Sequence, residues 1–120
     1  MSENNLGAMC PTDASPEHRN YRDPTMHEMK CWPQFFEAIA RGLKRHDLRR
    51  FRDRDFRIGD RVRLREFDPV IERYTGREQF VEITYITSAE QPCALSGNAL
   101  HADYCILSIV PISGAEVRLC

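Results

Sequence analysis

The sequence predicts an α+β domain in which a mixed, mainly antiparallel set of about five strands curls into a β pseudobarrel, with one short helix near the start. Three observations support this prediction. Apolar residues recur with a helical period at only one place, several later segments alternate apolar and polar side chains, and 120 residues suffice for one domain. Strands of this number and length twist against one another and therefore curl instead of staying flat.

The chain is expected to consist of a leader (1–24), one domain (25–113) and a short tail (114–120). The leader combines Ser, Asn, Asp, Glu and Pro with few large apolar residues, so it cannot bury enough surface to offset chain entropy and is predicted to be disordered. It lacks the basic start and apolar core of a secretory signal. No apolar run in the chain approaches the roughly 18 residues of a membrane span, so no membrane association is expected.

The first strand and the helix are predicted from neighbouring segments. Residues 26–32 show the alternation of a half-buried strand, although not perfectly. Pro33 suits the first turn of a helix, where its missing N–H is no loss. Gly42 follows the last periodic residue and predicts the helix end. The apolar face predicted for the helix over 34–41 comprises Phe35, Phe36, Ile39 and Ala40.

Two more strands are predicted around a charged connection. Residues 44–50 are expected to form a strand, and 51–56 to connect it to the turn at 58–60, where Gly59 can adopt positive φ. Residues 61–67 alternate clearly and give the strongest strand prediction. Their inward side chains are expected to be Val62, Leu64 and the neighbourhood of Phe67, and their outward ones Arg61, Arg63 and Arg65.

The last part of the domain is predicted as a hairpin followed by a central strand. Residues 68–69 break the preceding strand, 74–77 (YTGR) indicate a hairpin turn, and 80–86 form the returning strand. Residues 88–101 indicate a loop. The continuous apolar run 104–112 is predicted to be a central strand buried on both faces.

Positive charge is concentrated in residues 40–65. This stretch holds eleven Lys and Arg residues against four Asp residues, a net charge of +7, whereas the whole chain sums to −1 and the remainder therefore to −8. Segregation of this kind on a nearly neutral chain indicates one positive face and an anionic partner.

The cysteines predict neither a metal site nor a disulfide framework. There are five, an odd number, and none are in C-x-x-C spacing, whereas zinc requires close pairs of Cys or His. Free thiols in a reducing cytoplasm are expected, and no metal or cofactor is predicted. The two that lie in apolar runs, Cys31 and Cys105, are expected to pack as small hydrophobes.

A short motif begins where the helix is predicted to end. Gly42, Lys44, Asp47 and Arg49 resemble the G-x-K-x-x-E-x-R signature of ASCH domains, which belong to the PUA-like superfamily. In this chain Asp47 stands where the family usually has Glu.

A longer series of blocks resembles the DUF3850 family of ASCH-like domains over about residues 26–112. The family pattern H-E-L-K-x-x-P is matched at 27–33, and an aromatic pair in the helix follows. D-R-D-F-x-x-G-D is matched at 53–60, L-R-E at 64–66, and Y-T-G-R at 74–77, and an apolar strand closes the series. The ordered series is specific, whereas the short motif alone is weak.

The resemblance implies a PUA-like pseudobarrel with an RNA- or nucleotide-binding cleft beside the helix. In a regular strand Lys44 and Asp47 would face opposite sides because they are three residues apart. A bend after Gly42 would allow both to line one cleft, with the carboxylate holding the ammonium. The alternative is an exposed ion pair worth about 0–1 kcal/mol.

The predicted nucleic-acid contacts divide by chemistry. Arginine suits bidentate contact with phosphate, and unpaired bases stack on aromatic rings. Trp32 and Tyr74 are the predicted stacking residues, with partial burial in the core as the alternative, and Arg54 has a structural ion pair with Asp55 as its alternative. The charged residues predicted to contact RNA or a modified nucleotide are Lys30, Lys44, Asp47, Arg49, Arg50, Arg52, Arg54 and Arg77.

The leading functional prediction is a monomeric, cytoplasmic binding module, and two other classes stay open. Some small bacterial ASCH proteins are amidohydrolases that remove the acetyl group of N4-acetylcytidine with a Lys, a Thr and a later Glu. Lys44 matches that Lys, but Asp47 stands at the Thr position and Glu90 is only a loose counterpart. Asp47 would also stabilise the ammonium, whereas a catalytic Lys needs a lowered pKa. The third class is a protein-interaction subunit acting through the acidic remainder.

Overall fold

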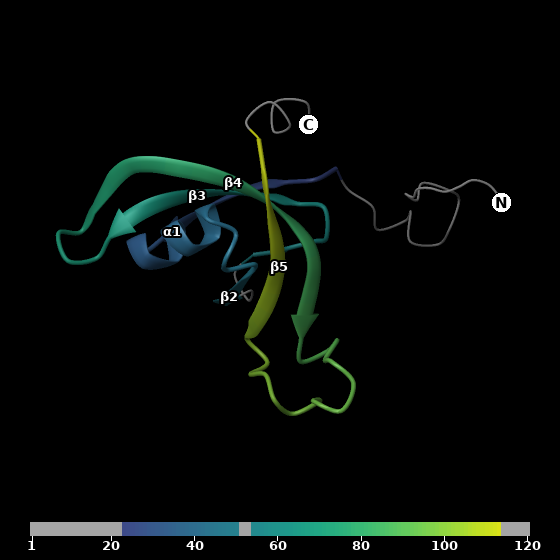
Figure 1. Ribbon diagram of the computed structural model, residues 1–120. Coiled ribbons are helices and arrows are strands. Elements are labelled where there is room, and N and C mark those ends of the chain that lie inside the picture. The colour runs from purple at the N-terminus through teal and green to yellow at the C-terminus, as the bar shows by residue number, and fades with distance from the viewer. Residues whose placement is uncertain (1–22, 51–53, 114–120) are drawn as a thin grey trace.

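Five strands and one helix form the part of the chain that the computed structural model describes, residues 23–50 and 54–113 (Figure 1). The elements are β1 (Met26–Cys31), α1 (Pro33–Ala40), β2 (His46–Arg50), β3 (Arg61–Asp68), β4 (Arg73–Ser88) and β5 (Tyr104–Ile112). The predicted order of strands and helix is confirmed. The tail at 114–120, and the leader up to residue 22, lie outside the described residues.

The strands form one mixed sheet in the order β1-β3-β4-β5-β2. β1 pairs in parallel with β3, whereas the β3–β4, β4–β5 and β5–β2 pairs are antiparallel. The sheet curls into a half-barrel (Figure 1), which confirms the predicted α+β pseudobarrel with mainly antiparallel strands. β1 and β2 are the two edges of this sheet.

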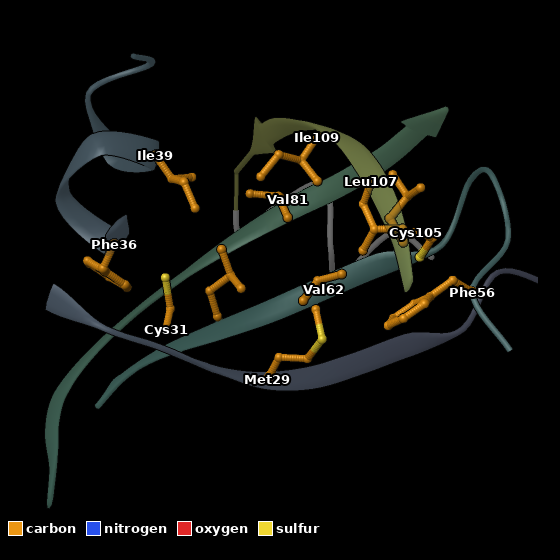
Figure 2. Packing of buried hydrophobic residues seen from close by; sticks show 12 residues of the cluster. Met29, Cys31, Phe36, Ile39, Phe56, Val62, Val81, Cys105, Leu107 and Ile109 are labelled. Carbon is orange, nitrogen blue, oxygen red and sulfur yellow. The ribbon is translucent and has the colours of Figure 1, made fainter. Parts of the chain in front are cut away.

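The core fills the inner face of the half-barrel. Alternate residues of β1, β3, β4 and β5 point to this face, and α1 contributes Phe36 and Ile39 from above one end of it (Figure 2). Phe56, from the connection that precedes β3, closes the other end beside Met29 and Val62. Each buried side chain of this size contributes roughly 1.5–3 kcal/mol of transfer free energy. The core residues are Met29, Cys31, Phe36, Ile39, Phe56, Val62, Leu64, Val81, Ile83, Cys105, Leu107 and Ile109.

The helix begins and ends where the sequence indicates, but its buried face is narrower than predicted. Pro33 occupies the first turn, and Gly42 adopts φ 77 just beyond the last helical turn. Phe36 and Ile39 are buried, whereas Phe35 and Ala40 are exposed, so the prediction that both belong to the apolar face is wrong. A helix of only eight residues contacts the sheet along one narrow strip of its surface. Here that strip holds two residues, at positions i and i+3.

The predicted hairpin turn at 74–77 is wrong, because these residues lie within β4. The chain reverses at 69–72 instead. Arg65 pairs with Glu78 and Phe67 pairs with Tyr74, so residues 75–77 oppose Glu66 alone in a β-bulge. Gly76 has φ 97 in this bulge. Positive φ at glycine is as useful in a bulge as in a turn, and the local sequence does not distinguish the two.

β5 is central in the sheet, as predicted, but only one of its faces is buried. It pairs with both β4 and β2. Cys105, Leu107 and Ile109 point into the core, whereas Tyr104 and Val110 are exposed on the outer face. The described residues place α1 over the inner face and no second layer over the outer one, so a continuous apolar run here does not mean burial on both sides.

A buried carboxylate fixes the turn that precedes β3. Asp60 is 1% exposed and accepts hydrogen bonds from the backbone N–H groups of Thr25 (3.0 Å) and Arg57 (2.9 Å). His27 Nε2 lies 2.8 Å from the same carboxylate. Gly59, at φ 98, provides the predicted turn. The sequence did not predict that Asp60 is buried.

The helix α1 is short, and the described cysteines are unpaired. In the part of the chain that the structure describes, no helix is long and apolar enough to cross a membrane. Cys31, Cys93 and Cys105 are free thiols, and Cys31 and Cys105 are buried in the core as predicted.

Candidate functional site

The motif segment leads from the end of α1 into the edge strand β2. The backbone N–H of Lys44 still donates to the carbonyl of Ala38, so Lys44 lies against the helix. Asp47 and Arg49 are half-buried, whereas the residues that alternate with them in β2 are exposed. The structure therefore directs Asp47 and Arg49 to the inner face and keeps Lys44 beside α1.

Arg49 connects the two edges of the half-barrel. Its Nε donates to Asp47 Oδ2 (2.8 Å), and its Nη2 donates to the carbonyl oxygen of Lys30 in β1 (2.7 Å). Among the described residues Lys44 makes no ion pair, and its Nζ lies 5.7 Å from the ring centre of Phe35. Asp47 thus pairs with Arg49 and not, as the motif suggested, with the ammonium of Lys44.

Charged groups of both signs act on the buried thiol of Cys31. Burial is the main cause that raises the pKa of this thiol to about 11. The carboxylates of Asp47 and Glu66 raise the pKa further, and the cations of Arg49 and Lys44 oppose them. The pKa of the Cys105 thiol is also raised to about 11, by burial and then by Asp47. At neutral pH both thiols are protonated and are therefore not nucleophiles.

Arg77 holds the helix against β4. Its Nη2 lies 3.0 Å from Glu37 of α1 and its Nε lies 3.6 Å from Glu66, while the guanidinium sits 4.8 Å from the ring centre of Phe36. Thr75 Oγ1 also donates to Glu66 (2.6 Å). The predicted nucleic-acid contact Arg77 is therefore engaged within the domain.

Glu66 is a buried site residue that the sequence reasoning missed. It is 6% exposed and lies on the inner face of β3. Extending the alternation of Val62 and Leu64 by two residues would have found it, whereas the prediction assigned the next inward position to the neighbourhood of Phe67. Phe67 follows the bulge and is only half-buried.

Lys30 and Tyr74 lie in a cluster on the outer face of the sheet. Lys30 Nζ is 4.2 Å from the ring centre of Phe67, and the Arg65 guanidinium is 3.9 Å from that of Tyr74. The two rings pack edge to face at 5.2 Å. Because Asp47 and Arg49 point to the inner face, the structure separates Lys30 and Tyr74 from the motif carboxylate.

Trp32 forms an exposed stack with Phe35 at the start of α1. Their ring centres are 6.3 Å apart and their planes differ by 21°. Trp32 is 47% and Phe35 44% exposed, so neither is a core residue. With Lys44 over Phe35, these residues place two aromatic rings and an ammonium side by side. Phe35 was not predicted as a site residue, because the helical period assigned it to the buried face.

The remaining predicted residues lie apart from this stack. Arg50 is exposed, and Arg54 donates to the carbonyl of Glu28 in β1 (3.1 Å). The ion pair considered for Arg54 is formed by Arg57 instead, which lies 3.0 Å from Asp55. Arg52 lies outside the described residues. Glu90 is exposed in the connection between β4 and β5, which extends beyond the sheet and away from α1 (Figure 1).

The domain matches a known family model over most of its length. The model for a domain of unknown function, DUF3850, covers residues 26–109, from the start of β1 into β5. The matched region includes the aromatic stack, the motif segment and the cluster of Lys30 and Tyr74 on the outer face. No curated protein gives a significant match to the chain.

Proposed function

The chain belongs to the DUF3850 family, and on that premise we propose that it is an RNA- or nucleotide-binding module. The proposed contact is the aromatic–lysine surface, defined as Trp32, Phe35 and Lys44. The observation that carries the proposal is the exposed stack of two aromatic rings with an ammonium 5.7 Å from the centre of one of them.

The aromatic–lysine surface combines the two interactions by which proteins hold unpaired nucleotides. Exposed rings stack on bases and contribute roughly 1–3 kcal/mol per base, while a cation attracts the phosphates. A base stacked on Trp32 or Phe35 would also cover apolar surface that is now exposed.

The charge of Lys44 is available to a ligand because Asp47 is already paired. The Asp47 carboxylate lies 2.8 Å from Arg49, which also binds a main-chain carbonyl. Among the described residues the ammonium group of Lys44 contacts only the Phe35 ring and forms no ion pair. A phosphate approaching Lys44 therefore needs to break no ion pair within the described part of the chain. Arg50, exposed on β2, adds a further cation on the same segment.

We further propose that the domain falls within the ASCH group of the PUA-like superfamily. The support is the strand and helix order together with the G-x-K-x-x-D-x-R motif directly after α1. The free thiols fit a cytoplasmic protein, and a monomer is proposed as the binding unit.

Salt-dependent binding to a labelled single-stranded RNA of about twelve nucleotides, within the usual site-size range, tests the proposal. Lys44→Ala is expected to weaken binding several-fold. The decrease of log K with log salt should also become less steep by about 0.7, the contribution of one phosphate contact. Arg73→Ala removes the same charge from the exposed start of β4 and is the matched control. Binding of Lys44→Ala that equals the wild type at every salt concentration would refute the proposal.

A further inference from the structure

We infer that the ligand is an unpaired RNA strand, several nucleotides long, that runs from the aromatic–lysine surface to a second contact on the outer face of the sheet. This second contact is the outer-face cluster, defined as Lys30, Arg65, Phe67 and Tyr74. The inference rests on the proposed function and adds the class of nucleic acid to it.

The two contacts meet at the end of β1. Lys30 points away from the core, because its neighbours Met29 and Cys31 are both buried. Trp32 follows β1 directly with an extended backbone (φ −67°, ψ 152°) and precedes the first residue of α1, so it lies at the end of the strand that carries Lys30. Two extended residues span roughly 6–7 Å. The inferred RNA strand passes from Trp32 to Lys30 over this distance.

The outer-face cluster has two cations held over aromatic rings, and one of them, Lys30, has no ion pair with a described residue. Lys30 makes no ion pair with another described residue and is held 4.2 Å from the centre of the Phe67 ring. The Arg65 guanidinium lies 3.9 Å from the centre of the Tyr74 ring. It also forms a long ion pair, 3.7 Å, with the Glu28 carboxylate. Lys30 can therefore meet a phosphate without breaking an ion pair with a described residue, and Arg65 has only the long pair with Glu28 to give up.

The neighbouring part of the same face shows the contrasting arrangement. Arg63 lies 2.6 Å from Glu28 and 2.6 Å from Glu78, so its charge is compensated on both sides. Exposed ion pairs such as those of Arg63 with Glu28 and Glu78 are common on the outer face of a strand. Beyond these pairs lies Lys30, which pairs with no described carboxylate and sits beside the exposed rings, and this combination of a free cation with aromatic rings marks the cluster as a binding surface.

Two separate aromatic contacts require a ligand with unpaired bases. Tyr74 is 41% exposed and can receive a base, as can the stack of Trp32 and Phe35. Bases in a duplex are stacked on each other and do not offer their faces to side chains. A mononucleotide has one base and fills one contact at most. Affinity should therefore rise with length until both contacts are occupied.

Binding of oligouridines of increasing length, from one nucleotide to about twelve, tests the inference by fluorescence anisotropy competition. The wild type is expected to gain affinity with length and to prefer the single strand over a duplex of equal length. Tyr74→Ala should lower affinity for the longest strand about tenfold, the effect of one stacked base, and leave affinity for the shortest bound strand unchanged. Lys30→Gln removes an exposed charge and keeps both rings of the cluster, so it should act in the same direction. Arg73→Ala is the control.

The outcomes separate this inference from the proposed function. Affinity that depends on Lys44 but not on strand length, or equal competition by the duplex, would overturn the single-strand inference and leave the binding module intact. Equal losses for short and long strands in Tyr74→Ala and Lys30→Gln would also overturn it. Failure of every oligouridine to bind would overturn both.

Discussion

Replacing Arg49 by alanine is expected to destabilise the domain, although the motif suggested a phosphate contact at this position. The guanidinium joins β2 to β1 through the carbonyl of Lys30 (2.7 Å) and also pairs with Asp47 (2.8 Å). Because β1 and β2 are the two edges of the sheet, no backbone ladder replaces this link. Alanine at residue 49 removes the link and leaves the Asp47 carboxylate without its partner.

The size of the effect follows from these two contacts. A hydrogen bond from a charged donor contributes roughly 1.5–3 kcal/mol. The Asp47 side chain is 14% and the Arg49 side chain 26% exposed, so water can replace part of what is lost. A loss of about 2 kcal/mol in the free energy of unfolding is therefore expected. At roughly 4–8 °C per kcal/mol for a domain of this size, Tm should fall by about 8–16 °C.

Arg50→Ala is the matched control, because Arg50 is the neighbouring arginine of the same strand and is exposed. It should change the free energy of unfolding by less than about 0.5 kcal/mol while weakening RNA binding. Urea denaturation of both variants, followed by circular dichroism, provides the comparison. If Arg49→Ala proves as stable as Arg50→Ala, the proposed link between the sheet edges does not hold.

Three further predictions concern the fold. Asp60→Ala should cost about 2–4 kcal/mol in urea denaturation, because two backbone N–H donors lose the buried carboxylate that accepts from them; a loss below about 1 kcal/mol would contradict this role. Gly76→Ala should cost roughly 1–2 kcal/mol because φ is 97 there, whereas Gly97→Ala, at ordinary φ, should be near neutral; equal effects would argue against strain in the bulge. Finally, raised thiol pKa values mean that the unfolded chain ionises first, so stability should fall as pH rises from 9 towards 11. A Cys31→Ala, Cys105→Ala variant should show a shallower fall over this interval, and an unchanged slope would contradict the assignment.

Much of the fold was predictable because its signals are local. Pro33 and Gly42 mark the limits of α1, and alternation along β3 identifies its buried face. The errors arose where one local signal serves two structures. Positive φ at Gly76 suits a turn or a bulge, and only the pairing of β3 with β4 decides between them. The exposure of Phe35 likewise depends on how much of a short helix the sheet covers.

The candidate site was less predictable because its partners are far apart in the sequence. The motif identified Lys44, Asp47 and Arg49, but the pairing of Arg49 with the carbonyl of Lys30 joins residues 19 positions apart. Burial of Glu66 depends on a strand alternation that continues into a charged residue. Such long-range contacts decide which cations are engaged within the domain and which are available to a ligand.

The most direct test of the proposed binding surface uses the intrinsic fluorescence of Trp32, the single tryptophan of the chain. Adding single-stranded RNA should quench this emission as a base stacks on the indole, and quenching and anisotropy should give the same dissociation constant. Lys44→Ala should shift both curves to higher RNA concentration. Binding detected by anisotropy with unchanged Trp32 emission would contradict the proposed surface.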